Sequence, residues 1–88
     1  MPSRIVEIVN MRGLHARASA KFVTCARKFT ASIDVSHDGQ TVPGRSIMGL
    51  MMLAATPGSR ITISAEGDDA EAALTALAEL VAGRFGED

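Results

Sequence analysis

The chain has 88 residues, of which 47% are hydrophobic and 22% are charged, and its formal net charge is −1 at pH 7. This composition predicts a single globular domain over residues 1–88, too small for a second domain or for a deep substrate cavity beside the core. The absence of a basic excess and the aromatic content of only 3% disfavour a nucleic-acid binder, which needs positive charge and stacking platforms.

The spacing of apolar residues predicts seven secondary-structure elements. Apolar residues that recur every three to four positions predict a helix, and alternating ones predict a half-buried strand. Asp38-Gly39 is a strong hairpin signal, and Asp68 with Glu71 resembles a capping box. In chain order we expect a strand at 4–10, a helix at 16–29, strands at 32–36 and 40–42, a short helix at 47–54, a strand at 60–66, and a last helix that starts near Asp68 and is closed by Gly83 and Gly86.

The order β-α-β-β-α-β-α determines the predicted fold class. Strands with one apolar face bury that face under helices that carry an apolar stripe of their own. We therefore expect an α+β domain with one sheet covered on one side. The tail Gly86-Glu87-Asp88, which follows the last helix, is expected to be frayed.

The residue types favour neither a metal site nor a membrane span. Cys25 is the one cysteine, so no internal disulfide and no zinc cluster is predicted, and we expect no cofactor. Cys25 itself is expected to be a small buried hydrophobe on the apolar face of helix 16–29. The longest apolar region, 47–55, is far shorter than a membrane span. No secretion signal follows Met1, which favours the cytoplasm and no membrane partner.

The segment Gly13-Leu14-His15-Ala16-Arg17 carries the strongest chemical signal. It places His15 at the start of the predicted helix, where backbone N–H groups lack partners and the peptide dipoles add partial positive charge. Such a place favours an anion over a cationic imidazole, so His15 is expected to keep a free lone pair. A phosphoryl group on the ring would be held by the same N–H groups and by Arg17. On spacing alone, a capping histidine and a solvated arginine remain the commoner interpretation.

Together with the element order, three segments resemble the HPr family of phosphocarrier proteins of the bacterial phosphoenolpyruvate-dependent phosphotransferase system. They are Gly13–Arg17, Arg45-Ser46-Ile47-Met48-Gly49-Leu50-Met51 and Ile63-Ser64-Ala65-Glu66-Gly67. The resemblance covers nearly the whole chain and implies an open-faced β-sandwich with a four-stranded antiparallel sheet. It also implies that enzyme I, which draws on phosphoenolpyruvate, phosphorylates His15 on Nδ1, and that a IIA component then accepts the group. Arg17 would balance the charge in transit.

The resemblance implies a carrier and not a free-standing enzyme, and it leaves sugar uptake and nitrogen-related regulation both open. The chain departs from the family at Ala18, where proline is usual. Proline in the first turn of a helix fixes φ and removes a spare N–H. We expect the site to survive this change, with at most a shift in where the helix begins.

Two further features of the segment 45–51 have a structural and a functional interpretation. Ser46 is a preferred N-cap residue, and in some members of the family HPr kinase/phosphorylase phosphorylates this serine. Ile47, Met48 and Met51 form a candidate docking patch, because flexible methionine suits a surface that binds several partners in turn. Leu50 and Leu53 are expected to face the core.

The main alternative is a non-phosphorylated α+β binding or regulatory module, in which the His15 motif would be a coincidence. A small nucleic-acid binder is a third possibility, disfavoured by charge and composition. A monomer is expected, because a relay has to present its site to successive partners. The complexes with these partners should be transient, with interfaces near the small end of the usual size range.

Overall fold

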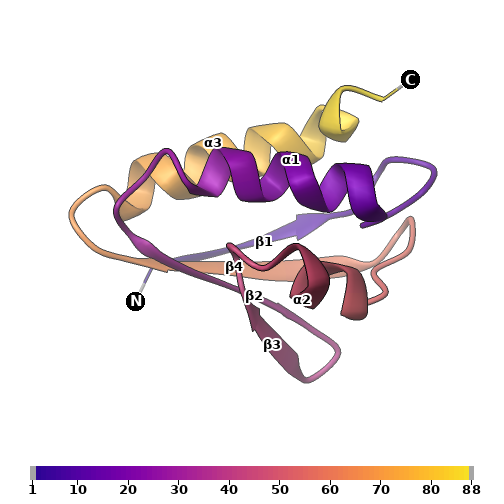
Figure 1. Ribbon diagram of the computed structural model, residues 1–88, viewed down its shortest axis with the longest axis horizontal. Coiled ribbons are helices and arrows are strands. Elements are labelled where there is room, and N and C mark those ends of the chain that lie inside the picture. The colour runs from indigo at the N-terminus through magenta and orange to yellow at the C-terminus, as the bar shows by residue number, and fades with distance from the viewer. Residues whose placement is uncertain (1, 88) are drawn as a thin grey trace.

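The computed structural model describes residues 2–87 and contains a four-stranded antiparallel sheet in the order β1-β4-β2-β3. Helices α1 and α3 run side by side over one face of this sheet, and α2 contacts α1 and β3 (Figure 1). The predicted α+β open-faced sandwich is therefore confirmed. The elements are β1 (Ser3–Glu7), α1 (Ala16–Ala26), β2 (Ser32–His37), β3 (Gln40–Pro43), α2 (Ile47–Met52), β4 (Arg60–Glu66), α3 (Ala70–Ala82) and a 3₁₀ turn η1 (Arg84–Gly86).

The two faces of the sheet differ in burial, as alternation along each strand requires. Val35 of β2 lies opposite Ile63 of β4, and both side chains are fully buried beneath the helices. On the uncovered face, Thr62 of β4 lies opposite Ile5 of β1, whose side chain is 65% exposed. The core therefore lies between one face of the sheet and the helices.

The apolar face of α1 agrees with the predicted helix face in part. Phe22 and Ala26 are fully buried. Cys25 is only partly buried and lines a shallow groove between α1 and α3, so its prediction as a buried hydrophobe was too strong. Burial raises the pKa of the Cys25 thiol, although the nearby Lys28 ammonium acts in the opposite direction.

Three elements end earlier than predicted, because the backbone changes its hydrogen-bonding partner there. In α1, the Phe29 N–H donates to the Ala26 carbonyl only three residues back, so the regular helix has already ended. Ala54, expected to end α2, has a φ of +54° and lies outside it. Beyond β1, the Ile8 N–H donates to the Ser59 carbonyl at 2.8 Å and pairs with the turn before β4.

The predicted capping box at the start of α3 was wrong. Asp69 is the N-cap residue, but its side chain makes no capping hydrogen bond. Its carboxylate instead accepts the backbone N–H groups of Thr30 at 2.8 Å and Ala31 at 2.9 Å. Asp69 therefore joins the start of α3 to the connection between α1 and β2.

The prediction of a frayed tail was wrong for the described residues, and Asp88 lies outside them. Phe85 in η1 is 1% exposed and has a φ of +54°, a left-handed conformation that costs energy in a non-glycine residue. The Lys21 Nζ of α1 donates to the Phe85 carbonyl at 2.6 Å. These contacts bring the C-terminal turn to the N-terminal end of α1 (Figure 1).

Candidate functional site

His15 is the N-cap residue of α1 and has an extended backbone. Its Nδ1 accepts the Arg17 backbone N–H at 3.2 Å. A ring nitrogen can accept a hydrogen bond only through its lone pair, so Nδ1 is the unprotonated nitrogen of the neutral imidazole. The side chain is 24% exposed. The predicted position at the amide-rich helix start is confirmed.

The loop before His15 is held by a close approach of two backbones. Gly13 has a φ of +64°, and a Cβ added there would lie 2.2 Å from the Ala55 carbonyl oxygen. The next residue, Leu14, is buried and donates its N–H to the same carbonyl at 3.1 Å. Only glycine fits position 13, because it tolerates positive φ and needs no space for a side chain. This contact sets where α1 begins.

Two functional candidates were missed by sequence reasoning, Glu87 and Asn10. A Glu87 carboxylate oxygen contacts His15 Nε2, and the other accepts the Asn10 Nδ2–H at 3.1 Å. The hydrogen bonds from His15 and then from Asn10 are the main causes that lower the pKa of the Glu87 carboxyl below its ordinary value. Neither residue belongs to a recognisable motif, since their contacts join positions more than 70 residues apart.

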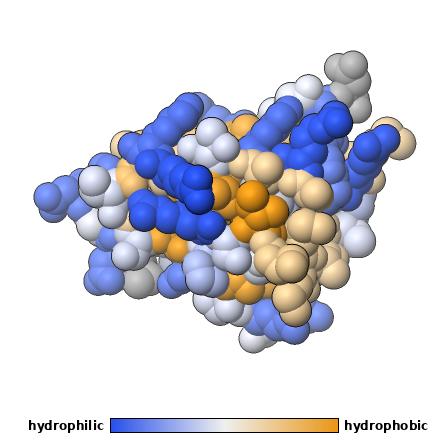
Figure 2. All heavy atoms as spheres, in the orientation of Figure 1, coloured by the Kyte–Doolittle hydropathy of each residue, from blue (hydrophilic) through white to orange (hydrophobic). Residues whose placement is uncertain are grey.

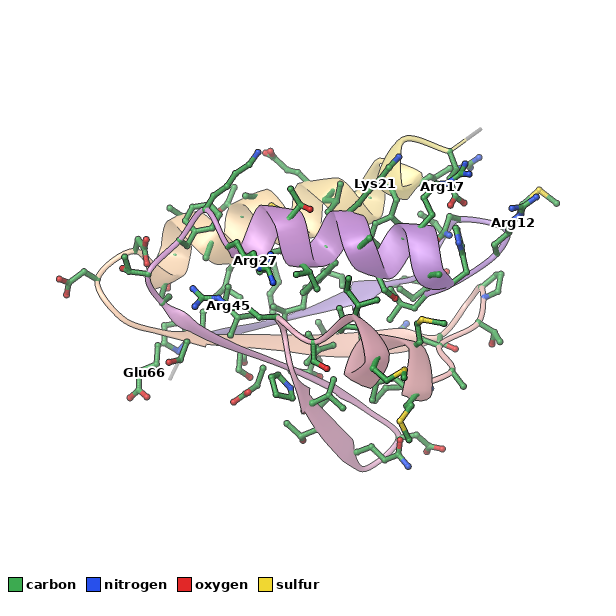
Figure 3. The ribbon with its side chains drawn as sticks, in the orientation of Figure 1. Arg12, Arg17, Lys21, Arg27, Arg45 and Glu66 are labelled. Carbon is green, nitrogen blue, oxygen red and sulfur yellow. The ribbon has the colours of Figure 1, made fainter. Side chains whose placement is uncertain are left out.

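A cleft of about 600 Å³ opens beside His15, between the start of α1 and the C-terminal turn. Three cationic side chains line it, those of Arg12, Arg17 and Lys21. Figure 3 shows these three side chains at the same end of the molecule, close to the C-terminal segment. The Glu87 carboxylate also lines the cleft, but the three cations outnumber it. Together with the helix N-terminus they make a surface that favours an anionic group.

The comparisons with known proteins agree with this geometry. The family model described as "PTS HPr component phosphorylation site" matches residues 2–83. The chain belongs to the HPr family. The predicted family resemblance is therefore confirmed, and the protein is a phosphocarrier of the phosphotransferase system.

Individual HPr proteins match over nearly their whole length. The phosphocarrier protein HPr of Cupriavidus necator is 47% identical over 99% of this chain and 98% of its own. A crystal structure of HPr-C-His from Thermoanaerobacter tengcongensis superimposes with a TM-score of 0.95 at 45% identity, covering 100% of this chain and 99% of the other. A crystal structure of an HPr dimer from the same organism gives a TM-score of 0.79 at 46% identity, over 99% and 100% of the two chains.

With Ala18 at the position where the family resemblance leads us to expect proline, the helix begins where the motif predicts it. α1 begins at Ala16 directly after its N-cap His15, and the Ala18 side chain is fully buried. Position 18 is the third residue of the helix, whose N–H group has no partner four residues back. The alanine therefore adds one backbone donor to a helix start that lies where the motif predicts it.

Ser46 has the predicted capping geometry. Its side-chain oxygen accepts the Gly49 N–H at 2.9 Å, and the residue precedes α2 directly. The preceding Arg45 reaches across to the turn that follows α1, where its guanidinium donates to the Phe29 carbonyl at 2.5 Å. Ser46 does not line the cleft beside His15.

The two faces of α2 are arranged as predicted. Leu50 is fully buried and Leu53 nearly so. The exposed side chains form what we call the methionine patch, and in the view of Figure 2 apolar atoms gather over α2. Met52 also belongs to this patch and was missed, although it follows Met48 at a helical spacing of four. The patch consists of Ile47 (41% exposed), Met48 (70%), Met51 (40%) and Met52 (72%).

Within residues 2–87 no helix is long and apolar enough to cross a membrane. The same residues contain no group of three or more histidine, cysteine, aspartate or glutamate side chains that could hold a metal ion.

Proposed function

We propose that this HPr-family protein accepts a phosphoryl group on His15 Nδ1 from phosphorylated enzyme I and passes it to a IIA component. The observation that carries the proposal is the orientation of the ring. The lone pair of Nδ1 points at the N-terminus of α1, where it accepts the Arg17 N–H, beside a cleft lined by cationic side chains. An incoming phosphoryl group would meet the nucleophile and the charge-balancing groups at one place.

The proposed reaction is an in-line displacement at phosphorus. The Nδ1 lone pair gives up its hydrogen bond from the Arg17 N–H and forms the new N–P bond. The bond from phosphorus to the donor breaks at the same time, and the electron pair of that bond leaves with the donor. Positioning and charge stabilisation supply most of the catalysis in phosphoryl transfer. In this proposal the N–H groups at the start of α1 and the Arg17 guanidinium, which lines the cleft, supply both. At an exposed helix start this stabilisation is about 0.3–1 kcal/mol, which is small enough for the group to leave again.

Transfer can be tested with enzyme I and phosphoenolpyruvate labelled with ³²P. We expect one acid-labile phosphate on the parent chain and none on His15→Ala. A matched control is His37→Ala, which removes the other histidine, at the end of β2, and should label fully. If the parent chain takes no label, the proposal fails and the alternative of a non-phosphorylated binding module is supported.

We propose that the partners dock on the methionine patch and on the exposed start of α1. Both surfaces belong to elements that contact one another. The α1 surface is cationic, through Arg17 and Lys21, and would complement acidic partner surfaces. Because the same surface would serve enzyme I and the IIA component in turn, each complex must be transient. We propose that the protein works as a monomer in the cytoplasm.

Ser46 is proposed as a second, regulatory phosphorylation site for HPr kinase/phosphorylase. A phosphate at a helix start is electrostatically tolerated, so its effect would fall on partners that approach the adjacent methionine patch. Incubation with ATP and that kinase should add one phosphate, detected by mass spectrometry. Ser46→Ala should abolish it, whereas Ser36→Ala, on an exposed hairpin, should not. No added phosphate would contradict the assignment.

The acceptor can be identified directly. Labelled protein is mixed with a sugar-specific IIA component and, separately, with a nitrogen-related IIA component. Rapid loss of label to one acceptor assigns the protein to sugar uptake or to nitrogen-related regulation. Transfer to neither acceptor contradicts the proposed carrier role.

A further inference from the structure

The carboxylate of Glu87 touches the ring nitrogen of His15 that the proposed reaction does not use. One of its oxygens contacts Nε2 across 72 residues of chain. A carboxylate only accepts hydrogen bonds, so Nε2 has to carry the proton in this contact. This agrees with the opposite side of the ring, where Nδ1 accepts the Arg17 N–H. Both contacts therefore select the same tautomer.

The second Glu87 oxygen is held by a buried amide. Asn10 is 1% exposed, and its Nδ2 group donates to Glu87 at 3.1 Å and to the Gly13 carbonyl at 2.8 Å. Asn10 thereby connects the loop that precedes His15 to the C-terminal turn. A buried side chain with few alternative positions is well suited to hold the carboxylate in a fixed orientation.

The C-terminal turn is itself anchored to the core. Phe85 is buried, and its carbonyl accepts the Lys21 ammonium of α1. The Glu87 N–H donates to the Arg84 carbonyl at 2.9 Å, which continues the turn up to the contact residue. Glu87 is thus presented to His15 by two fixed structures, α1 and the core.

From this arrangement we propose that Glu87 is a positioning residue, which holds the His15 imidazole as the Nε2–H tautomer and so leaves Nδ1 unprotonated, with a lone pair that can attack the phosphoryl donor once the Arg17 N–H releases it. The inference rests on the proposed function of His15. During attack, Nδ1 forms the bond to phosphorus while the proton stays on Nε2. The ring gains positive charge, which the carboxylate offsets, as carboxylates do behind other reactive or metal-binding histidines.

The electrostatics of the contact are consistent with this role. The pKa of Glu87 is lowered by its hydrogen bonds to His15 and Asn10, and Arg12 acts in the same direction. Arg17 and Lys21 also line the cleft and add positive charge around the carboxylate. Glu87 is therefore ionised at neutral pH, as the positioning role requires.

The test compares Glu87→Ala with the parent chain by two readouts. The tautomer is read above pH 7.5 from the ¹⁵N shifts of the His15 ring and from the couplings of its nitrogens to the ring carbon protons. This measurement needs neither a phosphoryl donor nor a partner protein. In the parent chain we expect protonation at Nε2 only, and in Glu87→Ala a mixture of both tautomers. The rate of labelling by enzyme I should fall by about tenfold, the low end of the losses seen when such carboxylate partners are removed.

Two more variants make the result specific. Glu87→Gln keeps an oxygen acceptor but no charge, so it should preserve the tautomer and label at an intermediate rate. The matched control Glu66→Ala removes a carboxylate at the opposite end of the molecule from Arg17 (Figure 3) and should change neither readout. Thermal melting verifies that each variant is folded.

The proposal is overturned if Glu87→Ala labels within twofold of the parent rate, or if its His15 ring has the parent tautomer. Failure of the proposed function looks different, because then the parent chain itself takes no label. The tautomer measurement remains informative in that case, since it reports on the contact alone.

Discussion

Arg17 contributes two chemically different groups to the site. Its backbone N–H donates to His15 Nδ1, a contact that depends on the helix start and not on the type of side chain. Its guanidinium lines the cleft with Arg12 and Lys21. A substitution that preserves α1 therefore leaves the first contact in place and tests the second alone.

Arg17→Lys is expected to slow labelling by enzyme I without unfolding the protein. Lysine keeps the positive charge but loses the planar fork that matches phosphoryl oxygens. The decrease in labelling rate should be smaller than the roughly 10²–10³-fold decrease seen when a whole oxyanion-stabilising donor is removed. Labelling kinetics and a melting curve check this. Labelling at the parent rate would assign Arg17 to ordinary surface charge.

Ala18→Pro is expected to stabilise the protein. Position 18 is in the first turn of α1, where proline fits the required φ and its missing N–H breaks no helical bond. The restricted unfolded chain should add about 0.4–1 kcal/mol to the free energy of unfolding, read as an increase in Tm. The matched control Ala20→Pro lies further into the helix and should cost about 3 kcal/mol. A lower Tm for Ala18→Pro would contradict the inferred helix geometry.

Asp69→Ala is expected to lower Tm at neutral pH, because the carboxylate accepts two backbone N–H groups between α1 and β2. The bond from the Thr30 N–H is the largest cause of the lowered pKa of Asp69, from an ordinary value of 3.8. Its stabilisation is thus complete above pH 3.8 and is lost as pH falls through the lower, folded-state pKa. The Tm difference between parent and variant should shrink at acid pH. Asp68→Ala, the neighbouring control, should melt like the parent, and an equal loss there would contradict this role.

At the scale of elements, α2 has a buried face that contributes to stability and an exposed face that we propose for docking. Leu50 contributes to the core, whereas Met48 is 70% exposed. With only six residues, the helix gains little from its own hydrogen bonds and depends on the buried face. Changes on the two faces should therefore have separable effects.

Met48→Glu is expected to weaken binding to enzyme I while the melting curve stays within about 0.5 kcal/mol of the parent, as is usual for exposed positions. The introduced carboxylate would be repelled by an acidic surface of the partner. Titration calorimetry with enzyme I measures the first effect. The contrasting variant Leu50→Ala should cost about 2–5 kcal/mol in the free energy of unfolding. Unchanged binding by Met48→Glu would remove the methionine patch from the docking surface.

Sequence patterns predicted the elements whose signal is local. The start of α1 follows from a histidine before a helical run, and the buried face of α2 follows from Leu50 and Leu53. The capping box at Asp68 was wrong because the N-cap residue is Asp69, one residue later. The Asp69 carboxylate does not cap the helix but accepts N–H groups of Thr30 and Ala31, nearly forty residues away. Local spacing carries no information about such a partner.

At the scale of the whole molecule, the C-terminal turn meets the loop before α1 and the start of that helix at the site. The contacts of Glu87 with His15 and Asn10 could not be predicted, because two glycines around one aromatic residue give no periodicity. The one available signal was Phe85 itself. The chain has only three phenylalanines, and a large apolar side chain near the C-terminus is a candidate for burial. Its left-handed φ is tolerated because burial and the Lys21 contact hold it in place.

Phe85→Ala should therefore affect both global stability and the site. Removing a fully buried phenylalanine costs about 3–5 kcal/mol, a large part of the roughly 4–13 kcal/mol expected for a domain of this length. With the turn released, the Glu87 carboxyl should lose its hydrogen bonds to His15 and Asn10, and its pKa should rise toward the ordinary value of 4.5. Urea unfolding and a ¹³C-detected carboxyl titration measure the two effects. Met52→Ala, an exposed control, should change neither. A Phe85→Ala variant that melts like the parent and keeps a lowered Glu87 pKa would mean that the C-terminal turn reaches His15 without its anchor.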